Sequence, residues 1–219
     1  MNEAITAFLI GFPALFSIVN PISGAFIFRA VTTRRPRAAQ ARLARLVGIN
    51  SCLVMVFALW AGSLVLSFFG ITLSALRVAG GLVVALSAWT LINNPEAQEE
   101  RKQEQAAPSE LSDDVAMFPL TIPFTTGPGT IAVAVALGAA HHSELKLQVW
   151  HMAGTTVAAL SMAVVIWLTY HSAEWISRWM GPTGSRTVTR LSGFLLLCIG
   201  VQILITGVEG VLGPLLARR

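Results

Sequence analysis

The hydrophobic positions of this chain are gathered into six long stretches that contain no charged side chain. These stretches cover residues 4–28, 46–76, 78–95, 115–143, 147–173 and 191–208. An α-helix needs about 20 apolar residues to cross the hydrocarbon core of a bilayer, and it satisfies its own backbone hydrogen bonds there. The second stretch is longer than one crossing requires, and Gly70, followed by Ser74 and Arg77, predicts a tight turn before the third. The pattern therefore predicts six transmembrane helices.

Composition excludes a soluble domain and favours an all-α membrane protein. Of 219 residues, 54% are hydrophobic and 12% are charged. A membrane β-barrel would show short segments of alternating hydrophobicity, which this sequence lacks. Cys52 and Cys198 both lie inside apolar stretches, so buried structural thiols are expected rather than a disulfide framework or a metal site.

Basic residues lie mainly on one side of the predicted helices. The connections after helices 1, 3 and 5 share a side of the membrane, and they hold most of the 15 Lys and Arg residues, including a cluster of arginines from Arg29 to Arg45. By the positive-inside rule this side is cytoplasmic, and both termini are predicted to be periplasmic. The net charge of +4 is then explained by loop arginines that fix topology and meet lipid headgroups, and nucleic-acid binding is not expected.

A polar segment divides the chain into two halves that resemble each other. Residues 94–114 are rich in Glu, Gln, Pro and Asp, and they predict a solvated cytoplasmic linker between a first repeat, 1–93, and a second repeat, 115–219. Phe12-Pro13 leads to Asn20-Pro21-Ile22-Ser23-Gly24 in the first half, and Phe118-Pro119 leads to Thr126-Gly127-Pro128-Gly129-Thr130 in the second. Three helices is an odd number, so the second half enters the membrane from the opposite side. We therefore expect two inverted-topology three-helix repeats, as in secondary transporters.

Helices 1 and 4 carry matched helix-breaking residues, which predict interruptions near the membrane midplane. Pro21 lacks an N–H and disfavours helical geometry at Asn20, and two glycines flank Pro128. Such breaks free N–H groups, which suit a carboxylate, at the start of one half-helix and carbonyls at the end of the other. Inverted symmetry would bring both breaks together around a small pocket. The predicted substrate-binding residues are Ser17, Asn20, Pro21, Ser23, Gly24, Thr125, Thr126, Gly127, Gly129 and Thr130.

Three further polar residues are candidates for a supporting role. Asn50 and Thr156 occupy equivalent positions of helices 2 and 5, and Gln202 lies in helix 6. Polar groups in a membrane need partners, so hydrogen bonds between helices explain these three residues equally well. For the two breaks, the alternative is that they only kink packed helices. A matched pair of breaks with hydroxyl and amide neighbours favours a binding site.

The predicted spans lack the residues that other mechanisms require. No Asp or Glu lies deep in a span, so a proton-coupled carrier lacks its usual carboxylate, while a coupling ion such as Na⁺ or H⁺, uncoupled exchange and export all stay open. There is no zinc-protease motif, pair of intramembrane acids or ATP-binding loop, so we expect neither an enzyme nor a cofactor. A non-transporting scaffold or regulatory subunit that docks through the linker is the alternative function. Gly62, Gly80 and Gly193 suit either packing within one chain or a homo-oligomer.

Several motifs in combination resemble the MarC family of bacterial inner-membrane proteins. They are Phe118-Pro119-Leu120-Thr121 with Gly127-Pro128-Gly129-Thr130-Ile131, the run Leu76-Arg77-Val78-Ala79-Gly80-Gly81-Leu82, and Arg190-Leu191-Ser192-Gly193-Phe194-Leu195-Leu196 with Gly200-Val201-Gln202. The likeness covers nearly the whole chain outside the linker. It implies six spans and membership among transporters, some of whose relatives carry small neutral amino acids. We therefore expect a secondary transporter or exporter of such small zwitterions across the bacterial inner membrane.

Overall fold

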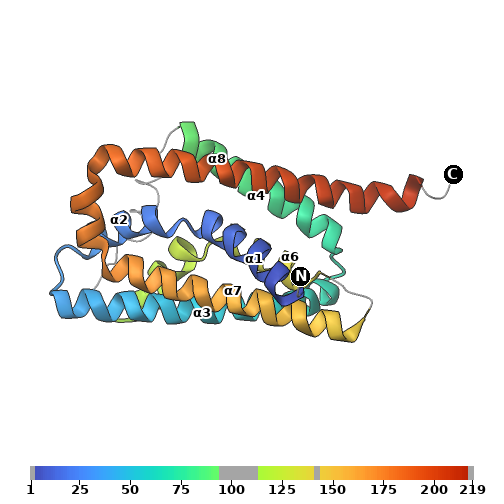
Figure 1. The fold of residues 1–219 in the computed structure, drawn as a ribbon, viewed down its shortest axis with the longest axis horizontal. Coiled ribbons are helices and arrows are strands. Elements are labelled where there is room, and N and C mark those ends of the chain that lie inside the picture. The colour runs from blue at the N-terminus through green and yellow to red at the C-terminus, as the bar shows by residue number, and fades with distance from the viewer. Residues whose placement is uncertain (1–2, 94–112, 141–143, 217–219) are drawn as a thin grey trace.

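The computed structural model describes residues 3–93, 113–140 and 144–216, and these residues form helices joined by short turns (Figure 1). In chain order the elements are α1 (Glu3–Val19), α2 (Pro21–Thr32), α3 (Arg37–Phe68), α4 (Leu73–Asn93), η1 (Asp113–Ala116), η2 (Met117–Thr125), α6 (Pro128–Gly138), α7 (Leu145–His171) and α8 (Ala173–Leu216). η1 is a 3₁₀ turn, and η2 has π-helical geometry. The expected linker, 94–114, lies outside the described residues except for its last two, which begin η1.

The helices lie in three layers (Figure 1). α3 and α7 run antiparallel along one side, and α4 runs antiparallel to the long second part of α8 along the other. α1, α2, η2 and α6 lie between these pairs, where α1 contacts α7 and α6 contacts α3. Leu15, Phe28, Leu120 and Ile166 are among the apolar side chains that fill this middle region. The middle layer is therefore the most enclosed part of the molecule.

The length and apolar character of the helices confirm an all-helical membrane protein. Among the described residues, five stretches are long and apolar enough to cross a bilayer, namely Glu3–Thr32, Arg37–Phe68, Leu73–Thr90, Leu145–His171 and Gly193–Gly213. They correspond to five of the six predicted spans. The predicted fourth span instead holds the 9 residues of η2 and the 11 residues of α6. At about 1.5 Å per residue, α6 reaches roughly 16 Å, about half of a bilayer core of about 30 Å.

Two glycines with positive φ set sharp turns between long helices. Gly70 (φ 67°) turns the chain from α3 into α4, as the sequence predicts. The N–H of Ile71 donates to the Leu66 carbonyl at 2.9 Å and closes this turn. Gly181 (φ 60°) bends α8 between a short first part and a long second part. Residues 174–190, which connect the fifth and sixth predicted spans, are helical, and only Gly181 among them departs from helical geometry.

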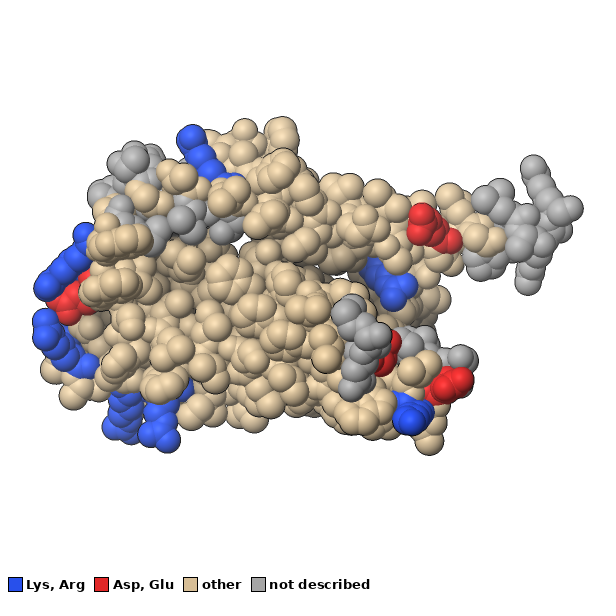
Figure 2. Space-filling model, viewed as in Figure 1, with Lys and Arg blue, Asp and Glu red and all other residues tan. Residues whose placement is uncertain are grey.

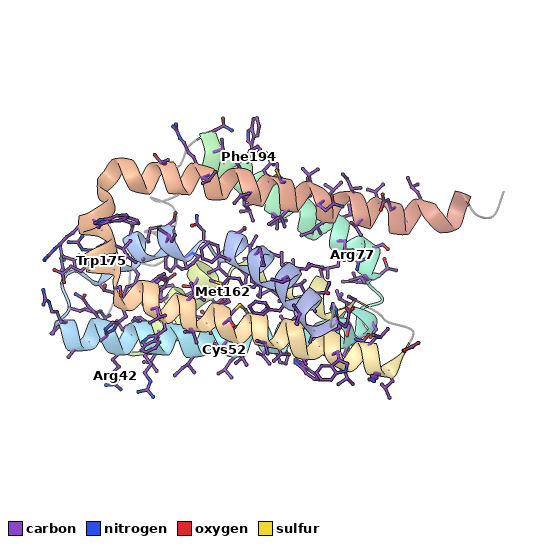
Figure 3. The ribbon with its side chains drawn as sticks, in the orientation of Figure 1. Arg42, Cys52, Arg77, Met162, Trp175 and Phe194 are labelled. Atoms are coloured by element: carbon purple, nitrogen blue, oxygen red, sulfur yellow. The ribbon has the colours of Figure 1, made fainter. Side chains whose placement is uncertain are left out.

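Charged side chains are concentrated at the two ends of the helical layers (Figure 2). Lys and Arg gather at the end where α2 meets α3 and α7 meets α8. Arg42 lies at this end, and Arg77 lies toward the opposite one (Figure 3). Between the ends, the outer faces of the long helices expose large apolar side chains, including Phe57, Leu64 and Leu86. An apolar middle with charged ends is the surface that bilayer-crossing helices require.

Candidate functional site

α1 and α2 are separated by a single residue with left-handed backbone geometry. α1 ends at Val19, Asn20 has φ 48° and ψ 64°, and α2 begins at Pro21. Asparagine tolerates this conformation because its short polar side chain can form a local hydrogen bond. Oδ1 of Asn20 accepts from the N–H of Ser23 at 3.4 Å and caps the first turn of α2. Because Pro21 has no N–H, the Ser17 carbonyl lacks the donor that usually reaches it from four residues further on.

The corresponding segment of the second half combines a π-helix, two non-helical residues and a short helix. η2 departs from helical dihedral angles at Phe118 and Ile122. Thr126 (φ −110°, ψ 74°) and Gly127 (φ −75°, ψ 179°) are non-helical, and α6 begins at Pro128. π-helical turns are rare and often occur at functional sites. Irregular backbone at membrane depth is tolerated where protein surrounds it or where it lines a cavity.

The hydroxyl groups of η2 are bonded to carbonyls five residues earlier. Thr121, Thr125 and Thr126 donate to the carbonyls of Ala116, Leu120 and Thr121 at 2.7, 2.7 and 3.0 Å. A bond across five residues matches π-helical register, so these side chains help to hold η2 in its geometry. A hydroxyl oxygen that donates in this way keeps lone pairs, which can accept a hydrogen bond from a ligand.

The two irregular junctions approach each other in the middle layer. A methyl group placed on Gly129, in the first turn of α6, would lie 2.9 Å from Cδ1 of Ile18, which is two residues before Asn20. The same methyl would lie 3.6 Å from Cγ2 of Val84 on α4. The absence of a side chain at Gly129 therefore allows the start of α6 to pack directly against the end of α1.

Tyr170 of α7 links the junctions at a second point, and no local sequence pattern indicates it. Its hydroxyl lies 3.0 Å from Oγ1 of Thr125 at the end of η2. A methyl placed on Gly24 of α2 would lie 2.5 Å from the same hydroxyl, and the ring stacks on Phe28 at 4.9 Å between centroids. The one signal in the sequence is that Tyr170 is the single tyrosine of the chain and lies in an apolar stretch.

The polar side chains predicted for the pocket are all buried. Each is at most 6% exposed, and they are Ser17, Asn20, Ser23, Thr125, Thr126 and Thr130. Pro21 and Gly24 are buried as well, whereas Gly127 and Gly129 are partly exposed. Nδ2 of Asn20 has no hydrogen-bond partner among the described residues. A buried donor without a partner is costly, so this N–H group is available to a ligand that supplies an oxygen.

The first turns of α2 and α6 differ in how their N–H groups are capped. Asn20 caps α2 through its side chain. Gly127 precedes α6, and no side chain caps the first turn of that helix. The first N–H groups of a helix have no partner within the helix and carry the positive end of its dipole. The start of α6, with the N–H groups of Gly129 and Thr130, is therefore the better of the two places for an anionic group.

The proposed supporting residues are placed differently from the pocket residues. Thr156 accepts a hydrogen bond from Trp60 Nε1 at 3.1 Å and donates to the Met152 carbonyl at 2.6 Å, so it joins α7 to α3. Gln202 is exposed on the second part of α8, and Asn50 is half-buried on α3. Hydrogen bonding between helices is thus what the structure shows for Thr156, and Gln202 is not brought to the junctions.

A carboxylate and an imidazole meet near the start of α1. Oε1 of Glu3 lies 3.5 Å from Nδ1 of His151, and Nε2 of His151 lies 3.0 Å from the Leu137 carbonyl. His151 therefore ties together the start of α1, the end of α6 and α7. Within the described ranges, no group of three or more His, Cys, Asp and Glu side chains could hold a metal ion. The groups gathered at the junctions are uncharged hydroxyls, amides and peptide groups.

Comparisons with known proteins place these features in a family. The model of the MarC family integral membrane protein matches residues 5–212. UPF0056 membrane protein YhcE of Escherichia coli is 26% identical over 94% of this chain and 93% of its own length. UPF0056 inner membrane protein MarC of Salmonella typhimurium is 30% identical over 95% of this chain and 96% of its own length. No solved structure matches this sequence. The chain, with its long apolar helices, belongs to the MarC family of integral membrane proteins.

Proposed function

We propose that this protein is a secondary transporter, rather than an enzyme, that carries small neutral amino acids or similar zwitterions across the bacterial inner membrane. The observation that supports this most is the pair of irregular junctions in the enclosed middle layer, where the predicted polar side chains are buried and the start of α6 has no side-chain cap. Asn20 adds a buried donor that has no partner among the described residues. These groups suit a small solute that carries both a carboxylate and an ammonium.

The two ends of such a substrate have different partners in this proposal. The carboxylate binds the N–H groups of Gly129 and Thr130 at the start of α6, together with Nδ2 of Asn20. The ammonium binds oxygen acceptors, which include the Ser17 carbonyl and the lone pairs of the buried threonine hydroxyls. A site of this kind recognises charge at both ends without a charged side chain.

The arrangement of the helices supports an inverted repeat and alternating access around these junctions. The α1–α2 segment and the η2–α6 segment run in opposite directions, as do α3 with α7 and α4 with α8 (Figure 1). The α1–α7 contact is matched by the α3–η2 contact, the α2–α7 contact by the α3–α6 contact, and the α2–α8 contact by the α4–α6 contact. This is the pairing that a two-fold axis in the membrane plane produces. In this proposal, η2 and α6 are the two half-helices of the fourth predicted span, which completes the set of six.

A reconstitution experiment tests the proposal directly. Proteoliposomes are loaded with labelled glycine, alanine, a carboxylate without an amine, or an amine without a carboxylate, each with and without a Na⁺ or H⁺ gradient. We expect counterflow of the zwitterions only. Movement of none of these solutes under any gradient would contradict the proposal and favour a scaffold, and deletion of residues 98–109 would then test docking through the linker.

Substitutions at Asn20 and Thr130 test the site while preserving the backbone. Asn20→Gly keeps the left-handed conformation that glycine adopts readily and removes the Nδ2 donor. Thr130→Val removes a buried hydroxyl at nearly constant volume. A buried hydrogen bond to a charged group contributes roughly 1.5–3 kcal/mol, so we expect transport efficiency to fall about tenfold or more for Asn20→Gly.

The matched control is Thr206→Val on α8, whose hydroxyl bonds to the Gln202 carbonyl away from the junctions. It should transport like the parent protein. Equal transport by Asn20→Gly, Thr130→Val and Thr206→Val, with all three correctly inserted, would remove the junctions from the binding site.

A further inference from the structure

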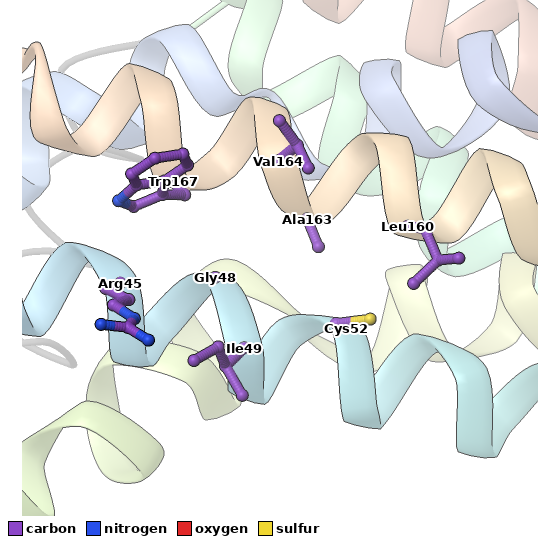
Figure 4. Close-up of a pocket in the computed structure, with 8 residues that line it drawn as sticks. All are labelled: Arg45, Gly48, Ile49, Cys52, Leu160, Ala163, Val164 and Trp167. Atoms are coloured by element: carbon purple, nitrogen blue, oxygen red, sulfur yellow. The ribbon is translucent and has the colours of Figure 1, made fainter.

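The outer surface between α3 and α7 contains a long hollow, separate from the junctions of the middle layer (Figure 4). Its volume is about 590 Å³, and its walls are apolar side chains, including Ile49 and Cys52 from α3 and Val164 from α7. Arg45 and Trp167 lie across from each other at one end (Figure 4). We call this hollow the α3–α7 groove.

The α3–α7 groove exists because small residues form its floor. Gly48 of α3 lies against α7 so closely that a methyl placed on it would be 3.0 Å from Cβ of Trp167 and 3.3 Å from the carbonyl oxygen of Ala163. Ala163 lines the groove from the other helix. The close backbone approach leaves larger side chains only on the two rims. The α3–α7 groove is thus a direct result of the close packing of these two helices.

The α3–α7 groove has exposed apolar rims, and these indicate which kind of molecule fills it. Ile49 is 46% exposed and Val164 is 50% exposed. In an integral membrane protein such apolar surface, within two long spans, faces lipid hydrocarbon and not water. An unfilled hollow would forfeit dispersion contacts along its lining, and water finds few polar partners there. A flexible acyl chain fits both the apolar lining and the volume of the groove.

The guanidinium group of Arg45 gives one end of the groove a positive charge, which favours an anionic partner. Arg45 is exposed, and no acidic side chain of the described chain lies within ion-pair distance of it. Arg42, one turn earlier on α3, lies at the end of the molecule where basic side chains gather (Figures 2 and 3). Guanidinium groups pair well with phosphate, and aromatic rings such as that of Trp167 are favoured at the membrane interface.

We propose that the α3–α7 groove binds one anionic phospholipid, with the phosphate at the Arg45 guanidinium and an acyl chain along the floor of Gly48 and Ala163. The groove is a basic site between two membrane helices at the arginine-rich end, which is the arrangement that recognises anionic headgroups. This lipid site is independent of the proposed transport function, because it lies on the outer face of the molecule.

Native mass spectrometry of the delipidated protein tests the headgroup. Binding of dioleoyl phosphatidylglycerol is compared with dioleoyl phosphatidylcholine, which has the same chains. We expect roughly fivefold tighter binding of the anionic lipid, as one arginine near a membrane surface provides. Arg45→Gln should abolish that preference. Arg34→Gln, an exposed arginine between α2 and α3 outside the groove, should keep it. Equal binding of both lipids to the parent, or a preference that survives Arg45→Gln, would overturn the proposal.

Filling the groove from its rim tests the acyl chain. Ile49→Trp and Val164→Trp place a large ring over the floor from two different helices, and both positions are exposed, so the fold is preserved. Each should lower phosphatidylglycerol binding at least fivefold. Leu53→Trp is the control, because Leu53 is 63% exposed on α3 and does not line the groove. Equal effects of Ile49→Trp and Leu53→Trp, or a change of oligomeric state with unchanged lipid binding, would show that the groove holds no lipid.

Discussion

At the scale of single residues, the missing side chain of Gly24 leaves the space that the hydroxyl group of Tyr170 fills. The Tyr170 hydroxyl occupies the space where a side chain at position 24 would begin, and it also contacts Thr125 on η2. Two irregular segments from different halves of the chain are therefore positioned by one ring on a third helix. This explains why a glycine lies in the first turn of α2 without having a positive φ.

Gly24→Ala should destabilise the protein, because the new methyl would lie 2.5 Å from the Tyr170 hydroxyl. Overpacking of this kind typically costs about 1–3 kcal/mol. Tyr170→Phe removes the nearest atom and should restore part of the loss in the double variant. Gly11→Ala, whose methyl would meet Ala158 at an ordinary 3.5 Å, is the control and should be neutral. The midpoints of thermal unfolding in detergent check this, and equal midpoints for Gly24→Ala and Gly11→Ala would contradict it.

The sequence predicts a site residue only where the pattern that indicates it lies close by in the chain. Pro21 and the glycines around Pro128 alter their own backbone, so the sequence alone indicates the polar residues beside them. The contribution of Tyr170 depends on a contact 45 residues away, to Thr125, and on the packing of α7. No local pattern encodes such a contact. The same holds for Glu3 and His151, which lie on different helices.

At the scale of elements, the bend of α8 depends on one residue. Gly181 has φ 60° and ψ −178°, a region that is essentially restricted to glycine. A methyl group placed there would meet no described residue within 4 Å, so we attribute the effect of an alanine substitution to backbone strain.

Gly181→Ala should therefore lower stability by about 1–3 kcal/mol, or straighten the bend. Gly213→Ala provides a matched control, because Gly213 also lies in α8 and has open space around it but no positive φ. Denaturant unfolding of the two purified variants gives the comparison. If Gly181→Ala unfolds like Gly213→Ala, the bend does not depend on the glycine conformation.

The sequence predicts best those helices that are indicated by the length of an apolar stretch alone. α3, α4 and α7 match their predicted spans for this reason. Apolar length does not encode hydrogen-bond register, so the change to π-helix in η2 could not be foreseen, whereas the helix-breaking residues around Pro128 predict an interruption where α6 begins. Residues 174–190, between the last two predicted spans, are helical, because a charged segment can remain helical outside the hydrocarbon core.

At the scale of the whole molecule, the two charged ends define an orientation. The start of α1 and the end of α8 lie at one end, and the arginine-rich connection from α2 to α3 lies at the other (Figures 1 and 2). With this orientation, the positive-inside rule predicts that the termini lie in the periplasm. The inverted repeat, which the odd number of predicted spans per half suggests, stays a prediction.

Single cysteines test this orientation in intact cells. In a variant with Cys52→Ser and Cys198→Ser, we expect Glu144→Cys, at the start of α7, to react with a membrane-impermeant maleimide added outside the inner membrane. Arg34→Cys, at the opposite end, should react only after the membrane is permeabilised. The reverse order of labelling would invert the topology and place the termini in the cytoplasm.

The uncharged lining of the paired junctions has an electrical consequence. In the transport function that we propose, a zwitterion held by hydroxyls, an amide and peptide dipoles brings no net charge into the bilayer, and the binding site contributes no charged side chain. Moving one elementary charge through the membrane potential changes the free energy by about 2.3 kcal/mol per 100 mV. The membrane potential does no such work on a neutral substrate in an uncharged binding site. Any current recorded during transport would therefore come from a coupling ion alone. The ratio of this current to the substrate flux would give the number of coupling ions moved with each substrate molecule.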